Sequence, residues 1–89
     1  MRSVDIITAA RAEALFTSNL PTGSAPTRAD TETAIRQAVH LYGGVRGCAS
    51  QMAYAYGDSP EAAASRMRWA RGVITADYPR RLHQRRSSC

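Results

Sequence analysis

Residues 45–76 decide the fold, and they read VRGCASQMAYAYGDSPEAAASRMRWARGVITA. The first part of this stretch predicts a helix over residues 45–56, because its apolar residues recur at three- and four-residue intervals. A second helix is predicted over residues 60–76. Its start is marked by Ser59, a typical N-cap, then Pro60 at the first helical position and Glu61 in the first turn.

Only Gly57, Asp58 and Ser59 separate these two predicted helices. A connection of this length forces a sharp turn, as in a helix-turn-helix. We expect Gly57 to end the first helix and to supply the backbone conformation of the turn. We expect Ala53 to give room where the second helix crosses closely. The buried stripe of the second helix is predicted to consist of Ala63, Met67, Ala70 and Ile74, the first two packing onto Met52.

Residues 48–71 combine small residues around the turn with a Ser-Arg-apolar signature in the second helix. The residues of this pattern are Met52, Ala53, Ala55, Tyr56, Gly57, Ser59, Ala63, Ser65, Arg66, Met67, Ala70 and Arg71. The pattern resembles the helix-turn-helix of region 4 of sigma factors and of LuxR-type regulators, and it covers about a quarter of the chain. The resemblance implies that the second helix lies in the major groove of DNA.

A helix in the major groove would contact DNA through the face opposite its buried stripe. The residues expected to bind DNA are Ser59, Glu61, Ala62, Ser65, Arg66, Arg68 and Trp69. Arg66 and Arg68 can reach guanine edges or phosphates, or they are ordinary solvated arginines. Glu61 either accepts from cytosine or complements the helix N-terminus. Trp69 contacts either DNA or a protein partner.

The last third of the chain carries all the excess positive charge. Residues 1–58 have no net charge, whereas residues 59–89 hold seven arginines and two acids, a net charge of +5. Residues 79–89 are expected to form a disordered tail, since they have no acid and almost no apolar content. Its arginines would attract phosphates without sequence preference, or would only solubilise the chain. They are Arg80, Arg81, Arg85 and Arg86.

The first half of the chain predicts two further helices. An alanine-rich stripe predicts a helix over residues 3–20, and the prolines and glycine of residues 21–26 predict a loop. Thr27 is a suitable N-cap for a helix over residues 28–42. The pair Gly43-Gly44 should end that helix, because glycine adopts the left-handed conformation without steric cost.

These patterns together predict one small all-α domain of four helices over residues 1–78, containing a helix-turn-helix, followed by the basic tail. No run approaches the roughly 18–20 apolar residues of a membrane span, and the first ten residues do not resemble a secretion signal. The two cysteines, Cys48 and Cys89, cannot form a disulfide framework or a four-ligand metal site. No catalytic motif and no phosphate-binding loop is present, so we expect no enzyme activity, no cofactor and no metal.

Two functions fit this sequence. The first is a bacterial transcriptional regulator that binds double-stranded DNA, located in the cytoplasm on the nucleoid, and a homodimer through the helix over residues 3–20 that contains Phe16. The second is an interaction module without DNA specificity, such as an accessory factor of a sigma factor or RNA polymerase, or an antitoxin-like adaptor. In that case Trp69 would face the protein partner. A non-specific nucleoid-type binder would need only the basic third of the chain.

Overall fold

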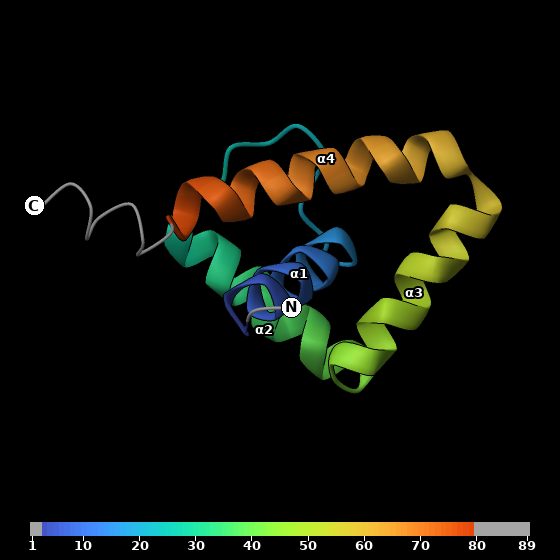
Figure 1. Ribbon diagram of the computed structural model, residues 1–89, viewed down its shortest axis with the longest axis horizontal. Coiled ribbons are helices and arrows are strands. Elements are labelled where there is room, and N and C mark those ends of the chain that lie inside the picture. The colour runs from blue at the N-terminus through green and yellow to red at the C-terminus, as the bar shows by residue number, and fades with distance from the viewer. Residues whose placement is uncertain (1–2, 80–89) are drawn as a thin grey trace, which may run out of the picture.

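Four helices and their connections make up the computed structural model, which describes residues 3–79 (Figure 1). They are α1 (Ser3–Phe16), α2 (Arg28–Tyr42), α3 (Val45–Asp58) and α4 (Pro60–Asp77). The prediction of an all-helical chain is confirmed, and no strand occurs among the described residues. The predicted disordered tail lies outside them, from Arg80 onward.

Helix α1 ends at Phe16, four residues before its predicted end. Two hydroxyl side chains stop it, because they donate hydrogen bonds to the carbonyl groups of its last turn. Thr17 Oγ1 donates to Ala14 O at 2.9 Å, and Ser18 Oγ donates to Leu15 O at 2.6 Å. Such local bonds between side chain and backbone compete with continuation of the helix.

Both ends of α2 confirm the sequence prediction. Thr27 Oγ1 accepts a hydrogen bond from the Asp30 amide at 3.1 Å, which caps the first turn. Gly43 has a φ of +77° and stands in the left-handed conformation. The amide of Gly44 donates to Val39 O at 2.8 Å, which satisfies a terminal carbonyl of the helix.

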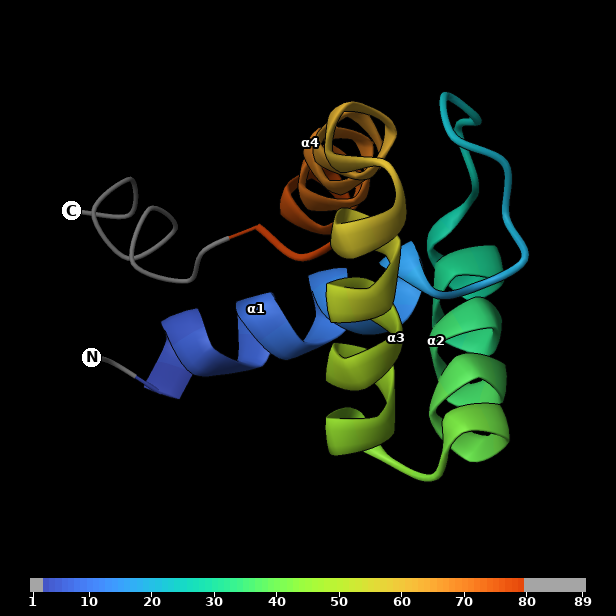
Figure 2. The ribbon, with the colours of Figure 1, turned by 90° about the vertical axis from the view of Figure 1, so that its right-hand side faces the viewer.

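The tight connection from α2 to α3 depends on a third glycine. A Cβ atom added at Gly47 would lie 1.6 Å from Tyr42 O, a distance that no side chain can tolerate. The absence of a side chain at Gly47 therefore lets α3 begin directly against the end of α2. Figure 2 shows the result, in which α2 and α3 run side by side.

The corner between α3 and α4 is shorter than the three-residue connection that the sequence predicts. Helix α3 continues through Gly57 to Asp58, so that Ser59 alone separates the two helices. Gly57 is helical and has no positive φ. Ala53 is exposed, because α3 turns its Cys48 and Met52 side inward instead. The predicted roles of Gly57 and Ala53 are therefore wrong.

Ser59 makes this corner by ending one helix and starting the next. Its backbone is extended, with φ −148° and ψ 90°. Its amide donates to Ala55 O at 2.9 Å, and its carbonyl accepts from the Ala63 amide at 2.9 Å. Its side chain makes no capping hydrogen bond, so Pro60 and the backbone define the start of α4.

The core gathers around the second half of α1. Leu15 and Phe16 are buried against α4, whose predicted buried stripe of Ala63, Met67, Ala70 and Ile74 is confirmed in full. The Phe16 and Tyr56 rings stack, with centroids 6.0 Å apart. A second cluster joins α1, α2 and α3 through Ala14, Ala38 and Cys48. The thiol of Cys48 is fully buried, as its place on the apolar stripe suggests.

Candidate nucleic-acid interface

The face of α4 that points away from the core is the candidate interface. Its exposed residues are Glu61, Ala62, Ser65, Arg68, Gly72 and Ala76, and we call them the outer face of α4. Most of them have small side chains, which lets the helix backbone approach another surface closely. Arg68 is the one long cation among them, and it makes no hydrogen bond or ion pair among residues 6–79.

Five of the seven residues predicted to bind DNA are exposed together at the amino-terminal half of α4 and its corner with α3. They are Ser59, Glu61, Ala62, Ser65 and Arg68. Their exposure makes this half of α4 accessible, and the corner stands at one end of the molecule in Figure 1. The remaining two residues, Arg66 and Trp69, are held by other parts of the chain.

Arg66 holds the carboxyl-terminal end of α1. Its Nε donates to Phe16 O at 2.6 Å, its Nη2 donates to Ser18 O at 2.9 Å, and its Nη1 donates to Thr22 Oγ1 at 2.8 Å. The guanidinium thus satisfies the carbonyl groups of Phe16 and Ser18 at the end of α1, where a positive charge is favourable. Partial burial lowers the pKa of Arg66 from its ordinary value, but an arginine stays charged at neutral pH.

Trp69 covers the same connection between α1 and α2. Its Nε1 donates to Ser24 O at 2.8 Å, and its side chain is half-buried. The guanidinium of Arg66 lies 4.9 Å from the Trp69 ring and 5.8 Å from the Phe16 ring, so the two residues form one unit with α1. This unit holds residues 17–26 against one flank of α4. Three residues of this connection, Ser24, Ala25 and Pro26, line one groove together with Arg68, Gly72 and Ala76 of the outer face.

The carboxyl-terminal end of α4 is fixed to α1 and α2. The guanidinium groups of Arg11 and Arg28 lie 3.9 and 4.6 Å from the centroid of the Tyr78 ring. The Tyr78 hydroxyl donates to Glu32 Oε2 at 3.3 Å. The buried hydroxyl of Thr31 donates to Asp77 Oδ2 at 2.7 Å. The arginines predicted to contact phosphates from the tail follow this end in the sequence, but they lie outside the described residues.

The sequence analysis did not predict the concave surfaces of the molecule, among them a groove between α1, α3 and α4. Its lining comes from three helices, so no local pattern in the sequence indicates it. Among residues 6–79 no group of three or more metal-ligating side chains comes together. None of the four helices is long and apolar enough to cross a bilayer.

Comparisons with models of protein families, with curated proteins and with solved structures find no match for this chain.

Proposed function

We propose that the protein is a DNA-binding transcriptional regulator that places the outer face of α4 in the major groove. The observation that carries this proposal is the helix pair itself: α3 and α4 meet at a single residue, and the exposed amino-terminal half of α4 holds Ser65 and Arg68 side by side with small residues. Helix-turn-helix proteins read base edges with an exposed helix that follows a sharp corner, and the exposure of α4 beyond Ser59 supports the proposal in this respect.

Arg68 is the principal contact in this proposal. An arginine on the outer face can bind guanine O6 and N7 with two hydrogen bonds, or it can bind a phosphate. Ser65, one turn earlier on the same face, can bind either. Arg66 is a structural residue in this account, because three of its nitrogen atoms already donate within the chain.

The basic tail adds a component that does not depend on sequence. Arginines 80, 81, 85 and 86 follow Pro79 in the sequence, and each phosphate that they neutralise would release counterions and make binding salt-dependent. A regulator of this kind acts in the bacterial cytoplasm, on the nucleoid.

A comparison of two arginine variants tests the proposal. Arg68→Ala removes the cation of the outer face, whereas Arg36→Ala removes an exposed cation from α2 and serves as the matched control. Affinity for a random-sequence duplex should fall for Arg68→Ala, and the slope of log K against log salt should decrease by about 1 if the contact is to phosphate. Arg36→Ala should behave as the natural protein. Equal affinities for all three proteins would contradict the proposal.

One observation favours a protein partner instead. Leu41, Val45 and Tyr54 are large apolar residues that stay exposed on α2 and α3, with Leu41 72% and Tyr54 75% exposed. Exposed aromatic and aliphatic side chains are common anchors of protein interfaces. An interaction module that docks on a sigma factor or RNA polymerase would lose its partner on Tyr54→Ala, and the same change would leave DNA affinity unaltered.

A further inference from the structure

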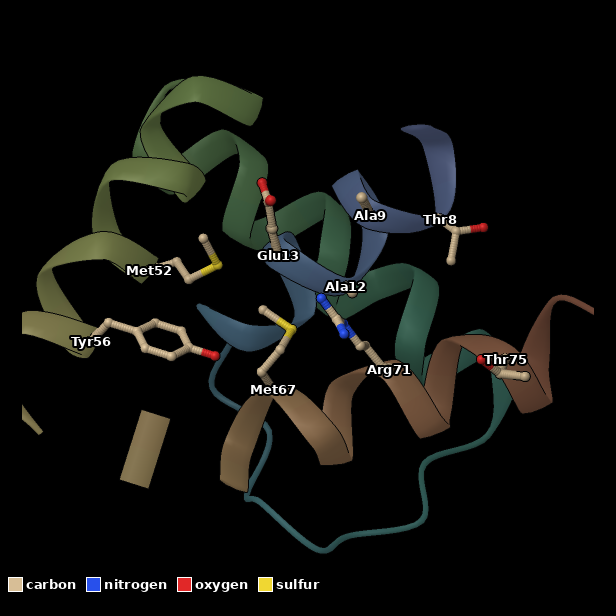
Figure 3. Close-up of a pocket in the computed structure, with 9 residues that line it drawn as sticks. All are labelled: Thr8, Ala9, Ala12, Glu13, Met52, Tyr56, Met67, Arg71 and Thr75. Atoms are coloured by element: carbon tan, nitrogen blue, oxygen red, sulfur yellow. The ribbon is translucent and has the colours of Figure 1, made fainter. Parts of the chain in front are cut away.

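A groove of about 390 Å³ opens between α1, α3 and α4 (Figure 3). Its surface is mainly apolar, and Met52 and Met67 approach each other from α3 and α4 across it. Methionine side chains adapt their shape easily, which suits a surface that receives another apolar group. The groove is lined by Thr8, Ala9, Ala12, Glu13, Met52, Tyr56, Met67, Arg71 and Thr75.

Opposite charges stand on two walls of this groove. Glu13 belongs to α1 and Arg71 to α4, and neither makes an ion pair within the described part of the chain. Figure 3 shows Arg71 reaching from α4 toward α1, while the Glu13 carboxylate points away from it. The groove therefore offers an occupant one carboxylate and one guanidinium that have no ion-pair partner among the described residues.

The amino-terminal half of α1 forms an apolar ridge beside the groove. Ile6 and Ile7 are 54% and 49% exposed, and Ala9, which lines the groove, is exposed as well. Figure 2 shows this half of α1 extending past α3 without another helix against it. Each chain thus carries a ridge and a groove next to each other.

We infer that the occupant of the groove is a second copy of this chain. In a two-fold dimer the α1 ridge of each copy lies over the groove of the other, so that Ile6 packs against the partly exposed Met52 side chain of the second copy. Glu13 then faces the partner's Arg71, and Arg71 faces the partner's Glu13. Charge complementarity supports this occupant, because in a two-fold dimer a contact between Glu13 of one copy and Arg71 of the other occurs twice, so that both charges of each groove gain a partner.

This dimer does not rest on the proposed function. Arg68 and Ser65 do not line the groove, so the outer face of each α4 stays exposed when the two copies associate. A failure to dimerise would leave DNA binding by α4 untouched, and a failure to bind DNA would leave the dimer untouched.

Charge reversal tests the dimer through its symmetry. Molar mass is measured by sedimentation equilibrium over a range of concentrations, under reducing conditions so that Cys89 cannot link two chains. The natural protein should dimerise, and Glu13→Arg and Arg71→Glu should each weaken dimerisation at least tenfold. Arg36→Glu, an equal reversal on exposed α2, should leave it unchanged.

Mixing the two reversed chains gives the decisive result. An equimolar mixture of Glu13→Arg and Arg71→Glu should form heterodimers, since each chain then faces its opposite charge at both sites. An effect within one chain would not be rescued by mixing. If either reversal prevents folding, Ile6→Asn replaces it, because Ile6 is half exposed and its change should weaken dimerisation without unfolding the chain. A natural protein that stays monomeric, or a dimer that is insensitive to all these changes, would overturn the inference.

Discussion

Arg66 and Arg68 lie two residues apart on α4, and only Arg66 is held by other parts of the chain. Arg66 donates to the end of α1 and to Thr22, whereas Arg68 is exposed on the outer face. The carbonyl that Arg66 Nε reaches belongs to Phe16, fifty residues earlier in the sequence. The guanidinium of Arg66 therefore stabilises the fold, whereas the guanidinium of Arg68 is exposed to a partner.

Replacement of Arg66 should cost stability, because its loss leaves partly buried acceptors at the end of α1 without donors. We expect Arg66→Ala to lower the free energy of unfolding by about 1–3 kcal/mol, and Arg66→Lys to recover only part of it, since lysine lacks the planar fork. Arg68→Ala should change it by less than about 0.5 kcal/mol. Urea denaturation followed by circular dichroism measures all three. Equal effects of the two alanine variants would contradict this role.

Two glycines of α3 should respond to alanine in opposite ways. Gly57 is helical and a Cβ there meets open space, so Gly57→Ala should raise the free energy of unfolding by up to about 1 kcal/mol. Gly47→Ala would place its Cβ on Tyr42 O. It should lower the free energy of unfolding by more than Gly57→Ala raises it. Thermal unfolding of both variants tests this. Destabilisation by Gly57→Ala would indicate that the glycine makes the turn after all.

Which individual residues make long-range contacts could not be predicted from the sequence. Periodicity placed the buried stripe of α4 correctly, because helical spacing alone fixes which side chains share a face. The helical spacing of α4 puts Trp69 on the face opposite the buried stripe and Arg66 on its flank, so it predicts that both are available to a partner. Arg66 and Trp69 instead donate to Phe16 O and Ser24 O. Which carbonyl groups they can reach depends on how α1 packs across α4, and no local pattern in the sequence predicts that packing.

At the scale of the helices, capping residues predicted boundaries well. Thr27 and the Gly43-Gly44 pair mark the ends of α2. There one capping side chain fixes where the helix begins, and one left-handed φ angle fixes where it ends. The end of α1 was misplaced, because Thr17 and Ser18 stop it with their own hydroxyl groups. The α3–α4 corner was misplaced as well, because a glycine in an exposed helix costs too little to end it.

The contact of the α4 terminus with α2 predicts a pH dependence. Burial and the neighbouring Glu32 carboxylate raise the pKa of Tyr78 above its ordinary value of 10.0, although Arg11 opposes this. The neutral phenol is therefore favoured by folding, and its contribution to stability is present below pH 10 and is lost as the pH rises through the raised pKa.

Replacement of the hydroxyl should remove this dependence. Between about pH 9 and 11 the free energy of unfolding should fall less steeply for Tyr78→Phe than for the natural protein. The phenyl ring of the variant keeps the packing against Arg11 and Arg28, so the difference reports the hydroxyl alone. Urea denaturation at a series of pH values measures it. Identical pH profiles would show that Tyr78 does not titrate in this way.

At the scale of the whole molecule, the four helices present two separate surfaces. The groove between α1, α3 and α4 contains opposite charges and is proposed to meet a second copy, whereas the outer face of α4 is proposed to meet DNA. The two surfaces share α4 but no residue.

Selection from a random pool of duplexes tests the central claim most directly, because it separates base reading from attraction to phosphates. The natural protein should enrich a defined sequence, and Arg68→Ala should lose preference for guanine at one position that α4 reads, while Arg36→Ala keeps it. Enrichment of no sequence by the natural protein, or of the same sequence with the same preferences by Arg68→Ala, would contradict the reading of DNA through the outer face of α4.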